Sequence, residues 1–332
     1  MQDIPVQFDL PSDLFRVGEA LREAGGRPFL VGGWVRDALL GYFHQQDFDL
    51  EVYGIPMDRL SKVLRPLGAV HAVGRHFGVL KLKTRDAAYD ISVPRRESNI
   101  GKGHKAFLVE TDPSMRFEDA AARRDFTINA MGYDFFASEL KDPWHGRADL
   151  ERRILRHVGP AFVEDPLRVL RAMQLAGRFE LDIAPETLSL CRSLDLAELP
   201  RERLWEEFKK LLLQARHPSR GLMFAAPLGV SGYFPELAAL AATDMEGGNL
   251  SAWEGTLGML DQAAGVRGNN DRDNLVLMLA ALCHRMDPGP ETLQGNTEKP
   301  RTRAFLDKLT NERPLIDSVA TLLTELQEPQ FL

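Results

Sequence analysis

Cysteine, long apolar runs and an excess of positive charge are scarce or absent in this chain of 332 residues. Cysteine occurs only at Cys191 and Cys283, which argues against a disulfide framework or a cysteine zinc site and suggests a reducing cytoplasm. No apolar run has transmembrane length, and the first residues lack the basic and apolar regions of a signal peptide, so we expect no membrane partner. The net charge of -7 argues against a generally basic nucleic-acid coat.

The remaining composition is that of an ordinary globular protein, with 44% hydrophobic and 27% charged residues and enough length for two or three domains. The positive charge is unevenly distributed along the chain. Arginines crowd its middle part, at Arg123, Arg124, Arg147, Arg152, Arg153, Arg156, Arg168, Arg171 and Arg178. This clustering favours a local phosphate-facing surface on a protein that is acidic overall.

The sequence Asp47-Phe48-Asp49 begins a segment that predicts a β-strand. Side chains alternate along a strand, so Asp47 and Asp49 share one face while Phe48 points into the core. Two acids on one face repel each other unless a cation lies between them, and Mg²⁺ is a hard cation that takes carboxylate oxygens. The pair is therefore either a metal site for phosphoryl transfer or a solvated strand face.

A short strand, a glycine pair and a helix are predicted ahead of these acids. Residues 28–31 are apolar, Gly32 and Gly33 follow at once, and residues 34–40 have helical character. This order brings backbone N–H groups and a helix N-terminus to a phosphate, although a glycine pair also makes an ordinary tight turn. Arg36 lies one turn into the helix, where it could reach a triphosphate or form a surface salt bridge.

Three later segments carry further candidates. Asp90 lies among apolar neighbours in a predicted strand, where an acid needs a partner, so it is either a third carboxylate of the metal site or part of a structural salt bridge. Residues 95–105 predict a polar loop that is either solvated or closes over a substrate. Residues 117–131 predict a helix.

The sequence Glu164-Asp165-Pro166 predicts the start of another helix. Glu164, Arg168 and Arg171 then share one helical face, and an intrahelical salt-bridge ladder is the structural alternative to a binding role. The rest of the chain predicts mainly helices, at residues 185–194, 200–214, 218–226, 253–264, 274–284, 302–309 and 314–326.

Five segments together resemble the class II tRNA nucleotidyltransferase / poly(A) polymerase family, which includes the bacterial-type CCA-adding enzymes. The likeness spans most of residues 28–240, and the segments follow in the order and at the spacing of the family. The matching segments are residues 30–41, 47–49, 123–131, 142–150 and 164–171. Five co-ordered motifs make a highly specific signal.

The resemblance implies an α+β protein in three parts. Residues 1–140 would form a head of nucleotidyltransferase fold with a small mixed sheet, residues 141–240 a helical neck that binds RNA and nucleotide, and residues 241–332 a helical body. It also implies a cytoplasmic enzyme that uses two Mg²⁺ ions to transfer CMP and AMP from CTP and ATP to the 3′ end of tRNA, releasing pyrophosphate.

The resemblance also assigns roles to residues in the matched segments. Asp47 and Asp49 would hold the metals. Asp90 lies outside the matched segments and is the candidate third catalytic carboxylate, with the structural salt bridge as its alternative. The expected nucleotide-binding residues are Gly33, Arg36, Arg124, Asp165, Arg168 and Arg171, supported by Gly32, Asp125, Asn129 and Glu164. Members of the family select the nucleotide with the residues that match Asp165 and Arg168.

The body departs from the family pattern. In similar relatives it carries a metal-dependent phosphohydrolase of the HD type, but here the first metal histidine is replaced by Gly255 and the His-Asp pair reads His284-Arg285. An arginine cannot bind a cation, so we expect an HD-like fold without this activity.

Several functions stay open at this point. The run at residues 73–82 looks like the CCA-adding branch, and the complete loop at 95–105 favours CCA- or A-adding activity over CC-adding. The alternatives are an A-adding enzyme, a poly(A) polymerase and an RNA-binding pseudo-enzyme. The intact carboxylates and arginines of the matched segments speak against the pseudo-enzyme.

Overall fold

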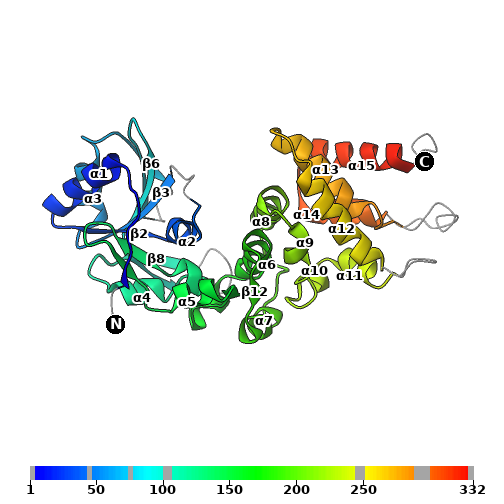
Figure 1. Cartoon of the computed structure of the whole chain (residues 1–332), viewed down its shortest axis with the longest axis horizontal. Coiled ribbons are helices and arrows are strands. Elements are labelled where there is room, and N and C mark those ends of the chain that lie inside the picture. Colours follow the sequence, from blue (N-terminus) through cyan, green and yellow to red (C-terminus); the bar gives the residue numbers. More distant parts are fainter. Residues whose placement is uncertain are drawn as a thin grey trace. The chain divides into compact units, whose positions relative to one another are not determined.

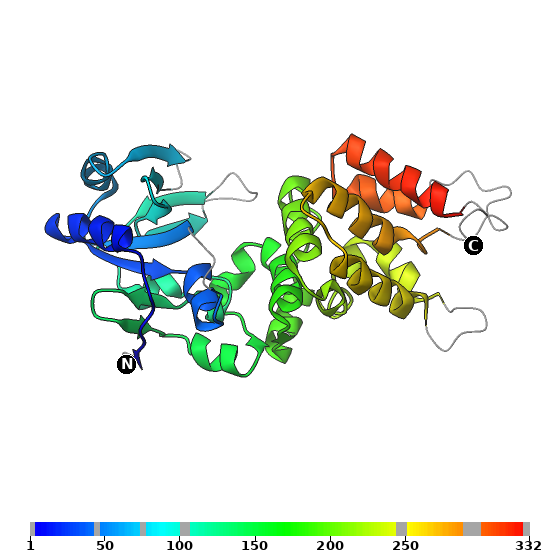
Figure 2. The same ribbon diagram turned by 45° about the horizontal axis from the view of Figure 1, so that its top comes forward.

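The structure, a computed structural model, describes residues 4–42, 47–73, 78–99, 107–243, 251–287 and 300–327. The chain divides into two compact units, which Figures 1 and 2 show in blue to green and in green to red. The first unit comprises Met1–Arg152 and Arg156–Phe162, and the second comprises Arg153–Leu155 and Val163–Leu332. Helices and a mixed sheet together confirm the α+β class.

The first unit is built on an eight-stranded sheet in the order β1-β10-β9-β2-β3-β6-β5-β4. Strands β3 and β6 run parallel, whereas the other neighbouring pairs are antiparallel, so the expected mixed sheet is confirmed but is larger than predicted. The strands are β1 (Ile4–Pro5), β2 (Arg27–Val31), β3 (Asp47–Tyr53), β4 (Ala69–Val73), β5 (Val79–Lys83), β6 (Ala88–Ser92), β9 (Gly132–Asp134) and β10 (Glu139–Lys141).

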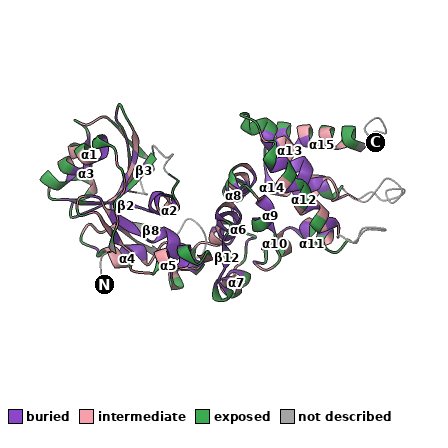
Figure 3. Ribbon diagram, in the orientation of Figure 1, coloured by how far each residue is buried: buried purple, intermediate pink, exposed green. Residues whose placement is uncertain are grey.

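The two faces of β3 differ in burial, as the alternation of its residues predicts. Phe48, Leu50 and Val52 are buried. Figure 3 colours each part of the ribbon by how far it is buried. Helix α1 (Ser12–Glu23) packs on β2 and on helix α3 (Met57–Leu64). The opposite face of β3 keeps Asp47 and Asp49 exposed.

A buried carboxylate ties α1 to the sheet. The Asp13 carboxylate accepts hydrogen bonds from Thr84 Oγ1 at 2.7 Å and Tyr89 OH at 2.8 Å, and Arg16 Nε lies 3.1 Å from its other oxygen. Desolvation raises the pKa of Asp13, but the hydrogen bonds from Arg16, Thr84 and Tyr89 outweigh it and hold the pKa below its ordinary value. Protein donors from Thr84, Tyr89 and Arg16 thus replace the water that would solvate the Asp13 carboxylate.

We expect Asp13→Ala to destabilise the chain by about 2–4 kcal/mol at pH 7, because two buried hydroxyls lose their acceptor. The folded state lowers the pKa of Asp13, so the ionised carboxylate stabilises the fold fully at pH values above its ordinary pKa of 3.8. This stabilisation is lost as the pH falls through the lower pKa of the folded state. Urea denaturation at pH 7 and pH 3 measures both effects, with Asp58→Ala on the exposed face of α3 as the control. Equal midpoints for wild type and Asp13→Ala at pH 7 would contradict the prediction.

The helix predicted at residues 117–131 was wrong beyond its first turns. Helix α4 covers Phe117–Ala121, and a 3₁₀ helix, η1, covers Thr127–Asn129. Between them the Asp125 carboxylate accepts hydrogen bonds from the backbone N–H of Phe126 at 2.8 Å and from Asn129 Nδ2 at 3.0 Å. A short acidic side chain that bonds the neighbouring backbone competes with the helix, and Phe126 is extended here.

The predicted loop at residues 95–105 begins as a strand. Strand β7 (Arg95–Asn99) pairs antiparallel with β8 (Phe107–Thr111), which the sequence did not predict. Residues 100–106 of the predicted loop lie outside the described residues, so its proposed closure over a substrate stays a prediction.

Residues 141–152, which we expected at the start of the neck, pack with the first unit. Helix α5 (Gly146–Glu151) is anchored there because Thr127 Oγ1 donates to Asp149 Oδ2 at 2.8 Å. The division between neck and body after residue 240 stays a prediction.

The second unit is helical apart from the short parallel pair β11 (Ile154–Leu155) and β12 (Asp182–Ile183), and η2 (Pro160–Glu164) precedes its first helix. Helices α10 and α11 were not predicted, while the other predicted helices are confirmed within a few residues. The helices are α6 (Leu167–Phe179), α7 (Pro185–Arg192), α8 (Arg201–Gln214), α9 (Pro218–Leu222), α10 (Val230–Tyr233), α11 (Pro235–Ala241), α12 (Ala252–Gly265), α13 (Asp271–Cys283), α14 (Arg301–Leu309) and α15 (Arg313–Gln327). In the part of the chain that is described, no helix is long and apolar enough to span a membrane.

Candidate active site

Three carboxylates gather on the polar face of the sheet. Asp47 and Asp49 are exposed on β3, and Asp90 lies opposite Asp49 in the parallel register with β6. Lys81, the partner of Asp90 on β5, places its Nζ 3.1 Å from Asp90 Oδ2. Asp90 therefore forms a salt bridge and also adjoins the acid pair, and its catalytic role stays a prediction.

The pKa of Asp49 is raised above its ordinary value. Desolvation of the carboxyl group is the largest cause, followed by the charge of Asp90; Asp47 adds to the rise, while Arg124 and Lys81 oppose it. Removal of the carboxylate from water, together with repulsion from Asp90 and Asp47, thus disfavours its charged form more than Arg124 and Lys81 favour it. A bound cation would relieve this repulsion.

The carboxylates of Asp47 and Asp49 fit a metal ion whose coordination is completed by the phosphates of a nucleotide. Among the residues that the structure describes, no group of three or more histidine, cysteine or carboxylate side chains is arranged to hold a metal ion alone. Mg²⁺ is commonly bound by one or two carboxylates and completes its shell with water and substrate phosphates. Asp47 and Asp49 provide such a pair on an exposed strand face.

The glycine pair creates space for two arginines. Gly32 has a φ of 71°, and a Cβ placed on it would lie 3.2 Å from Arg124 Nη1 and 3.8 Å from Asp49 Oδ2. A Cβ on Gly33, at the start of helix α2 (Gly33–Leu39), would lie 3.3 Å from Arg36 Nη2. The turn thus brings backbone, arginine and carboxylate close together at one end of the sheet.

Arg36 is buried, with 5% of its surface exposed. Its Nε donates to Asp37 Oδ1 at 2.8 Å and its Nη1 donates to Asn129 Oδ1 at 2.6 Å. Asn129 in turn donates to Asp125, so this network joins α2 to η1 beneath the glycine turn. The contact of Arg36 with a triphosphate stays a prediction, while its structural role is visible.

Arg124 lies beside the acidic residues of β3 and keeps 23% of its side chain exposed. Its Nη1 donates to the carbonyl oxygen of Asn129 at 3.4 Å, and its Nη2 lies 3.6 Å from Glu51 Oε1. Because it is partly exposed and close to both Gly32 and Asp49, Arg124 is suitably placed for a phosphate that reaches this turn.

The residues expected to choose the base lie in the second unit. Asp165 Oδ2 forms an ion pair with Arg203 Nη2 at 2.7 Å, and its Oδ1 accepts from the backbone N–H of Leu167 at 3.1 Å. Arg171 Nη1 lies 3.7 Å from Glu207 Oε1. Helix α8 therefore contacts both side chains, Asp165 just before α6 and Arg171 within it.

Arg168 is half-buried and Glu164 is exposed. The four expected residues of this unit thus come together at the start of α6, and the nine expected residues of the first unit come together at the carboxylate face and the glycine turn. The binding roles of both groups stay predictions.

Four neighbours of these residues were missed by the sequence analysis: Glu51, Lys81, Arg203 and Glu207. Arg203 and Glu207 stand at i and i+4 on the predicted helix at 200–214, and this opposite-charge pair was an available signal. Nothing in the sequence indicated which helix the pair would face.

The loss of the HD metal site stays a prediction, but the structure shows the hydrogen bonds of His284. Its Nδ1 lies 2.8 Å from the carbonyl oxygen of Ala281, and its Nε2 accepts from Arg285 Nε at 2.9 Å. Burial, and less strongly the charge of Arg285, lowers the pKa of His284 despite an opposing backbone hydrogen bond. Both ring nitrogens of His284 therefore have partners within the protein.

Comparison with known proteins identifies two family domains. Residues 28–156 match the family described as the poly A polymerase head domain. Residues 180–240 match the family described as the probable RNA and SrmB-binding site of polymerase A.

Two similar curated proteins, each named multifunctional CCA protein, come from Xanthomonas campestris pv. campestris (strain B100) and Stenotrophomonas maltophilia (strain R551-3). They are 40% identical over 220 residues and 41% identical over 222 residues, which is 64% of this chain and 52% of each relative. The chain therefore spans about half the length of the curated relatives it matches.

Solved structures share the fold across nearly the whole chain. The Bacillus stearothermophilus CCA-adding enzyme in complex with CTP has a TM-score of 0.67 at 24% identity, over 95% of this chain and 69% of that one. A tRNA-processing enzyme with CTP has a TM-score of 0.59 at 25% identity, over 94% and 80%. Residues 28–156 and 180–240 thus carry the head domain and the RNA-binding domain that the poly A polymerase family models describe.

Proposed function

We propose that this chain adds CMP and AMP, taken from CTP and ATP, to the 3′ end of tRNA without a template, and releases pyrophosphate. The observation that carries the proposal is the exposed pair Asp47 and Asp49 beside the Gly32 turn and Arg124, in a chain that matches the poly A polymerase head domain. The names of the relatives, multifunctional CCA protein and CCA-adding enzyme, support the choice of tRNA and of these nucleotides.

Asp47 and Asp49 would hold two Mg²⁺ ions. When bound, Mg²⁺ supplies a lowered pKa for the attacking 3′-hydroxyl and offsets the charge of the departing pyrophosphate. Arg124 and the backbone of Gly32 and Gly33 would bind the triphosphate, since backbone N–H groups and an arginine suit phosphate oxygens. No nucleophilic side chain is needed for this reaction, because the RNA hydroxyl is the nucleophile.

Asp165 and Arg168 would choose the base. A carboxylate accepts from an exocyclic amino group, and an arginine donates to the adjacent ring nitrogen, so cytosine and adenine satisfy both residues. Uracil and guanine present a carbonyl oxygen and a ring N–H there, which leaves both protein groups unpaired. One unsatisfied buried group costs about 1–3 kcal/mol, so two would reject UTP and GTP strongly.

We also propose the cytoplasm as the compartment. Cys191 and Cys283 are both buried and unpaired, which is the state of cysteines in a reducing environment.

Three tRNA transcripts test the proposed reaction, ending before CCA, after C and after CC. Each is incubated with the chain and Mg²⁺, and with CTP, ATP or both. We expect C and then A to be incorporated in the order that the 3′ end requires. ATP used only on the CC end would instead indicate an A-adding enzyme, and long A tails on unrelated RNA a poly(A) polymerase. No incorporation on any transcript would leave an RNA-binding protein without this activity.

A further inference from the structure

Glu51 is the third acid on the polar face of β3, two residues beyond Asp49. It differs from Asp47 and Asp49 because only 12% of its side chain is exposed, whereas they face solvent. A half-buried carboxylate next to a candidate metal site needs its own partners, or it adds to the repulsion there.

Each carboxylate oxygen of Glu51 has a different partner. Tyr53 OH donates a hydrogen bond to Oε2 at 2.6 Å, and Arg124 Nη2 lies 3.6 Å from Oε1. Glu51 thus connects a core residue of its own strand to an arginine that follows α4, more than 70 residues later in the chain.

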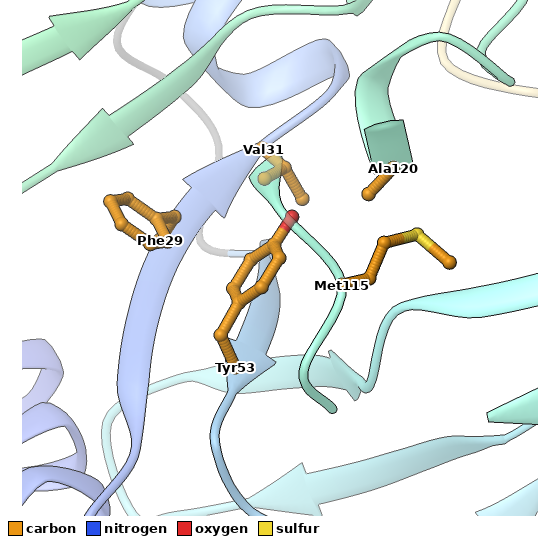
Figure 4. Close-up of a cluster of buried hydrophobic side chains, with 5 residues drawn as sticks. All are labelled: Phe29, Val31, Tyr53, Met115 and Ala120. Atoms are coloured by element: carbon orange, nitrogen blue, oxygen red, sulfur yellow. The ribbon is translucent and has the colours of Figure 1, made fainter. Parts of the chain in front are cut away.

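Tyr53 gives this connection a fixed end. It is buried in a cluster with Phe29, Val31, Met115 and Ala120, and Figure 4 shows its hydroxyl at the end of the ring far from its own strand. Its ring also makes an edge contact with Phe29, at 5.5 Å between centroids. Burial, followed by the charge of Glu51, raises the pKa of Tyr53, so the phenol stays protonated and donates.

Arg124 is the other end of this connection. Asp49 is another acid close to it, since a Cβ on Gly32 would lie 3.2 Å from Arg124 Nη1 and 3.8 Å from Asp49 Oδ2. If Glu51 did not hold it, Arg124 would gain by turning to Asp49 and neutralising that carboxylate. The same turn would draw Arg124 away from its present position beside Gly32.

We propose that Glu51 is a positioning residue for Arg124, held in place by Tyr53. It keeps Arg124 beside the glycine turn, where the guanidinium meets the phosphates of the nucleotide, and keeps Asp49 available as a metal ligand. This inference rests on the proposed function for the identity of the nucleotide, but it concerns binding and not the transfer step.

Binding of CTP without tRNA tests the inference, by calorimetry with and without Mg²⁺. The variants are Glu51→Gln, Arg124→Met and the double variant, with Glu139→Gln on β10 as a matched control. We expect Glu51→Gln to weaken CTP binding about tenfold, the scale of coupling between neighbouring charged groups, and to have no further effect in the Arg124→Met background. Glu139→Gln should bind CTP as the wild type does.

A role in stability alone would give a different pattern. It would lower the melting temperature of Glu51→Gln but leave the affinity for CTP unchanged, or weaken it equally in both backgrounds, and either result would overturn the inference. Tyr53→Phe removes one hydroxyl and should also weaken CTP binding, by a smaller factor. This variant provides a second measurement should Glu51→Gln fold poorly. Unchanged CTP binding by Tyr53→Phe would remove Tyr53 from the proposal.

Different experimental results would refute the inference about Glu51 and the proposed transfer reaction. A wild type that binds CTP but adds nothing to tRNA would refute the transfer reaction and leave the binding cycle intact. A wild type that binds no CTP would overturn both.

Discussion

Asp49→Asn is expected to abolish nucleotide transfer and, in the absence of metal, to make the chain more stable. The loss of activity should reach about 10³-fold or more, the scale seen when one preorganised group that stabilises transition-state charge is removed. The gain in stability follows from the raised pKa of Asp49, which desolvation and the charge of Asp90 cause. Because the residue is exposed, solvent screening should limit this gain to about 0.5 kcal/mol.

The stability difference between Asp49→Asn and wild type should change with pH in one direction. An acid with a raised folded-state pKa binds its proton more tightly when folded, so it destabilises the metal-free chain increasingly as pH rises through the interval above 3.8. The stability advantage of Asp49→Asn over wild type should therefore grow from pH 3 to pH 7. Added Mg²⁺ should reduce or reverse it, because only the wild type retains the ligand.

Transfer assays and urea denaturation in EDTA or Mg²⁺ measure these effects. Asp86→Asn, at an exposed turn of the same unit, is the matched control and should change neither activity nor the response to Mg²⁺. An Asp49→Asn chain that still adds nucleotides would remove Asp49 from the metal site. A variant less stable than wild type in EDTA would show that the carboxylates do not repel each other.

Arg203→Met is expected to relax the discrimination between CTP and UTP. In the structure Arg203 holds one oxygen of Asp165 at 2.7 Å, and the backbone N–H of Leu167 holds the other at 3.1 Å. Without Arg203 the carboxylate can rotate, so its acceptor direction toward the base is no longer fixed. We expect the ratio of kcat/KM for CTP over UTP to fall about 10- to 100-fold, the equivalent of one poorly paired buried group.

The ratio is measured on tRNA that lacks its 3′ end. Arg201→Met is the control, because Arg201 is on the same helix but its guanidinium bonds Asn311. Asp165→Asn should also reduce the ratio, since an amide can donate to the uracil carbonyl as well as accept. Equal losses for both nucleotides in Arg203→Met would indicate a structural role, and an unchanged ratio would separate Arg203 from base selection.

Local patterns predicted much of the fold. The alternation of acidic and apolar residues in 47–53 correctly predicted a strand with one polar face, because side-chain period follows directly from backbone geometry. The helical periods of the second unit were also reliable. The prediction at 117–131 was not, since its alanines favour a helix but α4 ends at Ala121, and the Asp125 carboxylate then bonds the backbone N–H of Phe126. Strands β9 and β10 are too short to show any period.

The chemistry of the site was less accessible from sequence than its location. Spacing identified Arg36 and Arg171 as candidates, but it could not show that Asp37 and Asn129 surround the first or that Glu207 faces the second. Those partners come from other segments, and sequence distance does not encode them. Glu51 lies on the same face of β3 as Asp47 and Asp49. Its lower exposure depends on residues from other segments, such as Arg124, which the alternation does not reveal.

The parallel junction of β3 with β6 limits how the length of this chain can vary. Asp49 lies opposite Asp90 only in the present register. A deletion of one residue inside either strand would exchange acidic and apolar side chains between the two faces. A deletion in β6, for example, would place Tyr89 or Ile91 where Asp90 now lies. Between these two strands, the connections that join α3, β4, β5 and β6 can absorb insertions without this exchange. Length variation in this part of the molecule should therefore be confined to its turns, while the two strands keep a fixed number of residues.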